Sequence, residues 1–120
     1  YLFMKIVVKL IIKVLVNSEI KLFAENNILP EFEILKNRDI SAQIVEFVKK
    51  EYNFLPTVCF PKLVSATVND DLFLYYDFYY PKDYIDEENV IKIVNIGNGF
   101  NNEDATEIRQ SVQIPPYQYV

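Results

Sequence analysis

Every second residue of the N-terminal stretch 1–16 is apolar, and this period constrains the fold more than any other feature of the chain. The only charged residues of the stretch, Lys5, Lys9 and Lys13, all stand at odd positions. Successive side chains of a β-strand point to opposite faces, so the pattern predicts a long strand with one continuous apolar face. The many β-branched residues also favour a strand. We therefore expect a domain built on a sheet that contains residues 1–16.

The three lysines admit a second interpretation, because a spacing of four also gathers them on one stripe of a helix. A basic amphipathic helix of this kind lies on anionic membrane surfaces. A membrane span or signal segment is not expected, since the lysines leave no uninterrupted apolar run that is long enough to cross a bilayer. The β-branched composition favours the strand over the amphipathic helix.

The rest of the chain predicts further strands and two helices. Strands are expected at 19–26, 62–68, 72–80 and 90–96, and helices at 39–52 and 103–113, the second capped by Asn102. This order predicts one α/β domain, residues 1–113, with a mixed β-sheet and a helix on each face. Residues 114–120 contain two consecutive prolines and are expected to leave the domain as an extended tail.

The helix expected at 39–52 has one face for a core and one face for solvent. Its apolar residues follow the spacing i, i+4, i+7 and i+8: Ile40, Ile44, Phe47 and Val48. Asp39 stands just before them and is a good N-cap, because its carboxylate accepts a hydrogen bond from a first-turn amide. On the free face Glu46 precedes Lys50 by four residues, which is the favoured order for a surface ion pair.

The segment 29–54, which contains this helix, resembles the signature of the Nudix hydrolases. In that family a Leu-Pro on a strand leads to Gly, five residues, Glu, seven residues and then Arg-Glu-apolar-x-Glu-Glu-x-Gly-apolar. Aligned without a gap on Leu29-Pro30, the chain has Phe32 at the first Gly, Arg38 at the first Glu, Glu46 at the Arg, Phe47 at the next Glu, Lys50 and Glu51 at the Glu pair, and Asn53 at the last Gly. The resemblance implies a Nudix-like α/β/α sandwich.

The same alignment implies that the chemistry of the family is lost. Nudix carboxylates on one helix face hold divalent cations that polarise a diphosphate. Here Phe47 and Lys50 stand in place of two acids, and Glu51 remains. One carboxylate beside an ammonium group cannot concentrate the negative charge that Mg²⁺ requires. The resemblance therefore implies a domain that is not an enzyme and that uses no cofactor or metal.

Two alternatives remain open on these residues. A metal-dependent nucleoside diphosphate hydrolase with displaced ligands would join Glu51 to an acidic loop formed by Asp83, Asp86, Glu87 and Glu88, although most such runs are solvated turns. A nucleotide-binding sensor would instead keep the cleft of the family, with Arg38 or Lys50 as the charge partner of a phosphate.

Composition excludes several other classes of protein. The net charge is −5, so no general affinity for DNA or RNA is expected. The chain has no His and one Cys, Cys59, which removes Ser-His-Asp and Cys-His catalysis and most zinc sites. A lone cysteine cannot form an internal disulfide, so we expect a reducing, cytoplasmic environment.

The strand expected at 72–80 carries aromatic residues on both faces. One interpretation is that a helix covers one face and the hairpin formed by the strands at 1–16 and 19–26 covers the other, so that these rings pack within the domain itself. The other is that some of them dock a protein partner, because tyrosine is enriched at protein interfaces. The docking candidates are Tyr76, Phe78, Tyr79 and Tyr80, together with Tyr117 in the tail.

These patterns lead to one hypothesis about function, a non-catalytic Nudix-like binding or assembly module that docks a protein partner. The resemblance implies such a role because members of this fold without catalysis are subunits of RNA-processing and ribosomal assemblies. A place in a larger ribonucleoprotein complex and a dimer of this chain are both consistent with the hypothesis.

Overall fold

The computed structural model describes residues 4–97 and 99–113. The extended tail expected at 114–120, with Tyr117, lies outside these residues. The main elements are β1 (Ile6–Val16), β2 (Glu19–Phe23), β3 (Glu31–Glu33), α1 (Ile40–Tyr52), β4 (Lys62–Asn69), β5 (Asp71–Tyr79), β6 (Ile93–Val94) and α2 (Asn102–Val112). Three short 3₁₀ helices complete them: η1 (Pro56–Val58), η2 (Lys82–Tyr84) and η3 (Glu87–Lys92).

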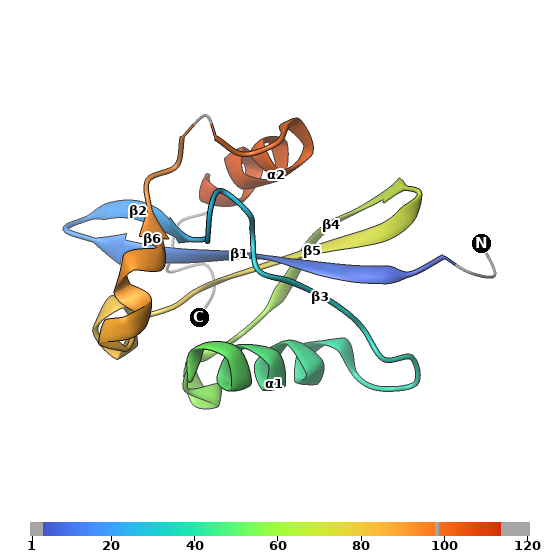
Figure 1. Cartoon of the computed structure of the whole chain (residues 1–120), viewed down its shortest axis with the longest axis horizontal. Helices are drawn as coiled ribbons and strands as arrows, with labels where there is room; N and C mark the ends of the chain where they lie inside the picture. Colours follow the sequence, from blue (N-terminus) through green and yellow to red (C-terminus); the bar gives the residue numbers. More distant parts are fainter. Residues whose placement is uncertain (1–3, 98, 114–120) are drawn as a thin grey trace.

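The strands form one mixed sheet in the order β4-β5-β1-β2-β6, and β3 pairs with β1 beside β2. β1 and β5 run parallel, whereas β4 pairs with β5, β2 with β1 and β6 with β2 in antiparallel register. The helices lie on opposite sides of this sheet, α1 on one face and α2 on the other (Figure 1). The expectation of an α/β domain with a mixed sheet is thereby confirmed.

β1 is the strand that its period of two predicts, and the amphipathic membrane helix is wrong for residues 6–16. Its even residues from Val8 to Val14, including Leu10 and Ile12, are fully buried in the core beneath α1. Its odd residue Ile11 belongs to a second core cluster with Ile108 of α2. Because both faces of the strand are covered, the odd lysines do not all reach solvent, and Lys13 is completely buried.

The α1 helix begins and ends as its sequence indicates. The Asp39 carboxylate accepts a hydrogen bond of 2.8 Å from the Ala42 amide, which confirms the expected N-cap. Asn53 ends the helix in the left-handed conformation, with φ of 58°. The expected ion pair on the free face is wrong, because Glu46 pairs with Arg38 rather than with Lys50.

Two expectations near the C-terminus are also wrong. Residues 90–92, expected as the start of a strand at 90–96, belong to η3 (Glu87–Lys92), and only Ile93–Val94 of that range pair with β2. The buried Asn89 side chain donates a hydrogen bond of 3.2 Å to the Tyr52 carbonyl, a tertiary contact that holds this turn against the end of α1. The N-cap of α2 is Asn101 rather than Asn102, since the Asn101 side chain accepts from the Asp104 amide at 2.8 Å.

Candidate functional site

Two positions that the alignment places at a Gly and an acid of the signature hold aromatic rings in contact. Phe32 on β3 and Phe47 on α1 stack with their centroids 4.5 Å apart and their planes inclined by 21°. Phe47 also meets Tyr52 edge to face at 6.0 Å. In the alignment Phe32 stands at a Gly and Phe47 at an acid, so apolar contact occupies the place of a small residue beside a carboxylate.

Arg38 and Glu46 form a bidentate ion pair at the exposed start of this region. The Arg38 guanidinium donates to both Glu46 carboxylate oxygens, at 2.9 and 2.8 Å. In the alignment Arg38 stands where the signature has a Glu, and Glu46 where it has an Arg. The two positions therefore carry the same two charges as the signature, but with acid and base exchanged. The Arg38 guanidinium is already bound by the Glu46 carboxylate.

The other charged candidates lie at the end of α1 and do not converge. Lys50 and Glu51 are both exposed. The acidic loop does approach this end of the helix, because the Asn53 side chain donates to the Asp86 carboxylate at 3.1 Å. Within residues 4–97 and 99–113, however, no three acidic, His or Cys side chains are grouped closely enough to hold a metal ion. The structure thus brings the loop to the helix without assembling a cluster of ligands.

The aromatic residues suggested for partner docking are mostly used by the domain itself. Tyr76, Phe78 and Tyr80 are buried in the core beneath α1, and Tyr79 is half-buried on the opposite face. Tyr80 stacks on Phe54 with centroids 3.8 Å apart, and its hydroxyl accepts a hydrogen bond from the Leu55 amide at 2.9 Å. Neither Tyr76, Phe78 nor Tyr80 is accessible to a partner in this fold, because β5 lies within the sheet with a helix layer on each side.

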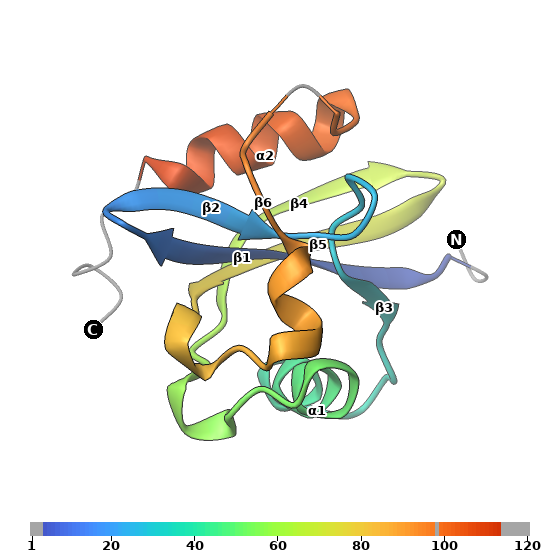
Figure 2. The ribbon, with the colours of Figure 1, turned by 60° about the vertical axis from the view of Figure 1, so that its left-hand side comes forward.

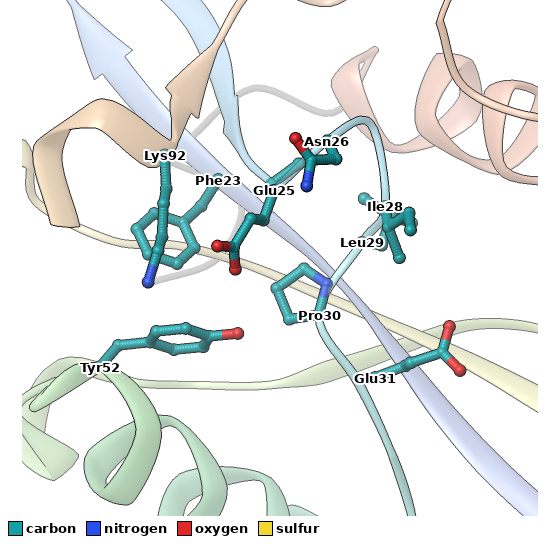
Figure 3. Close-up of a pocket in the computed structure, with 10 residues that line it drawn as sticks. Phe23, Glu25, Asn26, Ile28, Leu29, Pro30, Glu31, Tyr52 and Lys92 are labelled. Atoms are coloured by element: carbon teal, nitrogen blue, oxygen red, sulfur yellow. The ribbon is translucent and has the colours of Figure 1, made fainter.

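A pocket of about 290 Å³ lies between the end of α1, the β2–β3 connection and η3 (Figure 3). Its walls include Phe23, Pro30 and Tyr52, and the Glu25 carboxylate points into the same space. The Lys92 ammonium lies 5.3 Å from the centre of the Tyr52 ring and donates to the Asn89 side chain at 2.9 Å.

The electrostatics of this pocket are dominated by its acids. Burial, followed by the charges of Glu51 and Glu25, raises the pKa of Tyr52 to about 12. Glu25 and Glu31 line the pocket against the one cation of its lining, Lys92. A phosphate in this pocket would meet the Glu25 carboxylate, which points into it, so the charge of the pocket does not favour a nucleotide. Arg38, Lys50 and Glu51 do not line it, and sequence reasoning missed the pocket because its walls come from three separate parts of the chain, residues 23–31, Tyr52 and Lys92.

A second hollow, of about 520 Å³, lies between the start of α1 and the segment that leads into β4. It is lined by Asp39, Ser41, Ala42, Val45, Cys59, Phe60 and Pro61. Phe60, one of the lining residues, is 64% exposed, and Leu63 near the start of β4 is 51% exposed. Phe60 and Pro61 lie between the helix expected at 39–52 and the strand expected at 62–68, and the sequence assigned them no function.

No protein-family model matches this sequence, and no curated protein matches it. Among the described residues, no helix has the length and apolar character needed to cross a membrane.

Proposed function

We propose that this chain is a non-catalytic Nudix-like module that docks a protein partner within a larger assembly. The observation that carries the proposal is the stacked pair Phe32 and Phe47. Hard divalent cations need oxygen ligands, and two phenyl rings offer none. On the proposed alignment, the helix face that would bind metal has become part of the hydrophobic packing.

Two further contacts support the Nudix-like part of the proposal. Arg38 and Glu46 form an ion pair with each other. Such a pair is expected if the Glu and the Arg of the signature attract each other and the two residue types have exchanged positions in this chain. Asn53 has φ of 58° at the position where the signature has its last Gly. A left-handed backbone is the conformation for which glycine is usually selected, so the alignment is consistent with the local geometry.

The docking part of the proposal rests on exposed apolar residues that begin with Phe60 in the wall of the second hollow and continue along β4. We call Phe60, Leu63 and Val68 the β4 patch; they are 64%, 51% and 68% exposed. Large apolar side chains exposed beside a concave apolar surface are typical of protein interaction sites. The β4 patch replaces the buried Tyr76, Phe78 and Tyr80 as the proposed docking surface.

The catalytic part is tested with a panel of nucleoside diphosphate derivatives and dinucleotides in the presence of Mg²⁺ or Mn²⁺. We expect no turnover by the wild-type chain. Turnover that is abolished by Glu51→Gln would overturn the proposal in favour of a hydrolase with displaced ligands. Binding of a panel nucleotide without turnover, lost on Lys50→Ala, would favour the nucleotide sensor instead.

The docking part is tested by affinity capture from the source cells with two matched baits. The variant Phe60→Asp/Leu63→Asp places two charges in the β4 patch, whereas Ile91→Asp changes an 83% exposed side chain on η3. Loss of an interface anchor commonly costs about 2 kcal/mol, roughly thirtyfold in affinity, so only the first bait is expected to lose the partner. Equal recovery by both baits would reject this surface.

A further inference from the structure

The pocket of about 290 Å³ beside the end of α1 holds an acid and a base whose charged groups are directed into the same space. η3, orange in Figure 2, passes between the sheet and the end of α1, and its last residue, Lys92, enters the pocket from that side. Glu25 enters from the β2–β3 connection (Figure 3). Glu31, the other acid of the lining, points away from the centre of the pocket, and its carboxylate lies 4.0 Å from the Lys9 ammonium. The pocket therefore presents one negative and one positive group to a ligand.

These two charged groups do not neutralise each other. Among residues 4–97 and 99–113, no ion pair joins Glu25 to Lys92. The Lys92 ammonium donates to the buried Asn89 side chain at 2.9 Å, which holds it in place. An ammonium group has three donors, so hydrogen bonds remain for a ligand. Glu25 is exposed and Lys92 is half-buried, so a ligand can reach both from solvent.

The backbone fixes the direction in which the Glu25 side chain leaves the chain. The Glu25 amide donates to the Ile28 carbonyl at 3.2 Å, and the Ile28 amide donates to the Glu25 carbonyl at 3.0 Å. Between them Asn26 and Asn27 have φ of 54° and 59°. Two left-handed residues in succession form the tightest kind of hairpin turn. The carboxylate is thus presented from a short, closed turn.

The other walls of the pocket suit an apolar group and a hydrogen-bond acceptor. Phe23, Leu29 and Pro30 are buried apolar residues of the lining. The Tyr52 hydroxyl points into the space between Glu25 and Pro30 (Figure 3). Burial raises the pKa of Tyr52 to about 12, so at neutral pH this hydroxyl keeps its proton and can donate it to an acceptor. Pockets for drug-sized ligands measure about 300–1,000 Å³, so a ligand of this pocket is small.

From these groups we propose that the pocket binds a free α-amino acid with a small apolar side chain. The ammonium group of the ligand pairs with Glu25, and its carboxylate accepts hydrogen bonds from Lys92 and from the Tyr52 hydroxyl. Glu25 repels a ligand that is only an anion, and Lys92 repels one that is only a cation, whereas a zwitterion is attracted by both. The apolar side chain lies against Phe23 and Pro30. The pocket shares no lining residue with the second hollow, so the inference goes beyond the proposed docking function and does not depend on it.

The experiment titrates the isotope-labelled chain with three probes and follows the backbone amide signals by NMR. L-leucine carries both charges, isoamylamine keeps the same skeleton with the ammonium group alone, and isocaproate keeps it with the carboxylate alone. We expect L-leucine to shift the signals of residues 23–31 and to bind at least about tenfold more tightly than either analogue, because each analogue lacks one charge-assisted contact.

Two variants test the two charges separately. Glu25→Gln should weaken L-leucine by about tenfold or more and strengthen isocaproate, which is no longer repelled. Lys92→Met keeps the aliphatic stem of the side chain and should weaken L-leucine in the same way while it strengthens isoamylamine. The matched control is Glu31→Gln, the same change at the acid that points away, and it should alter the Kd of L-leucine by less than about twofold.

Circular dichroism establishes that each variant is folded, and the exposed position of Glu25 keeps the test decisive if Lys92→Met does not fold. Absence of amide shifts in the wild-type chain at about 10 mM L-leucine overturns the inference, since a ligand with a Kd of about 1 mM would fill about nine tenths of the sites. Equal affinity for L-leucine and isoamylamine overturns it in favour of a site for simple cations. An unchanged affinity of Glu25→Gln for L-leucine places the ligand outside this pocket and also overturns it.

Discussion

The two faces of the sheet bury their side chains in different ways. The face beneath α1 is packed with apolar and aromatic side chains, among them Leu10, Ile44 and Phe78. The face beneath α2 has a smaller apolar cluster and also encloses charged groups, including Lys13 and Asp77, both completely buried. One helix is therefore held mainly by the removal of apolar surface from water, and the other depends in addition on specific polar partners.

The polar contacts beneath α2 form two groups. In one, the Lys13 ammonium bonds to the Asp77 carboxylate at 3.3 Å and to the Ser111 carbonyl at 2.9 Å, and the Ser111 hydroxyl donates to Asp77 at 2.5 Å. In the other, Asp104 accepts from Lys9 at 3.1 Å and from the Tyr75 hydroxyl at 2.6 Å. Such groups specify where α2 must lie, because a displaced helix would leave charges buried without these bonds.

The largest expected effect comes from removing one member of the buried pair. Asp77→Ala leaves the Lys13 ammonium in the core without its counterion and should lower the free energy of unfolding by about 3–5 kcal/mol. Urea denaturation measures the change. The double variant Lys13→Met/Asp77→Leu removes both charges and should recover most of the loss. An Asp77→Ala chain as stable as the wild type would contradict the contrast between the two faces.

A rise to alkaline pH should change the contributions of the two faces to the stability of the domain in opposite directions. Burial beneath α1 raises the pKa of the Cys59 thiol from 9.0 to about 11. Between these values the unfolded chain releases the proton and the folded chain keeps it, so stability falls by up to about 2–3 kcal/mol as the pH rises. On the α2 side, burial lowers the pKa of Lys13 below 10.5 despite Asp77. The unfolded chain then holds the proton that the folded chain has lost, so this contribution rises with pH up to 10.5.

Two variants separate these contributions in urea denaturation at pH 9 and pH 11. Cys59→Ser keeps a hydroxyl that can donate to the Leu55 carbonyl, as the thiol does, and should reduce the alkaline loss of stability. Lys13→Met/Asp77→Leu should instead increase the loss, because it removes the opposing contribution. Asp77 also contributes to the raised pKa of Tyr79, and Cys59 to that of Tyr80, but burial is the larger cause for both tyrosines and is kept in the variants, so the expected signs stand. A change of the same sign in both variants would contradict the expected difference.

The smallest effects are expected at the two helix caps. Asp39→Ala and Asn101→Ala each remove the hydrogen bond to a first-turn amide and should destabilise the domain by about 1 kcal/mol. Asn101 also donates to the Asp104 carboxylate at 3.2 Å, whose other oxygen meets Lys9. In double-mutant cycles with Lys9→Met, Asn101→Ala should therefore be coupled and Asp39→Ala additive. If the effects of both cap variants are additive with that of Lys9→Met, Asn101 does not belong to the polar group around Asp104.

Predictions for individual residues were correct where the structure depends on sequence neighbours and wrong where it depends on contacts with distant residues. The N-cap Asp39 was predicted correctly because a cap depends on residues within one helical turn. Residues 90–92 were predicted wrongly as strand because the Asn89 contact with Tyr52, 37 residues away, holds the turn to which they belong. The docking candidates Tyr76, Phe78 and Tyr80 were misplaced because aromatic residues on both faces fit an interface and a strand enclosed between two layers equally well.

The sequence by itself determined the hairpin of β1 and β2, the hairpin of β4 and β5 and the length of both helices, because period and turn residues act between near neighbours. Only the tertiary structure decided what covers each face. The counterion of Lys13 is 64 residues away and that of Lys9 is 95 residues away. The alternating pattern of a strand predicts which side chains share a face. Whether that face meets water or a helix with matching carboxylates depends on how distant segments pack.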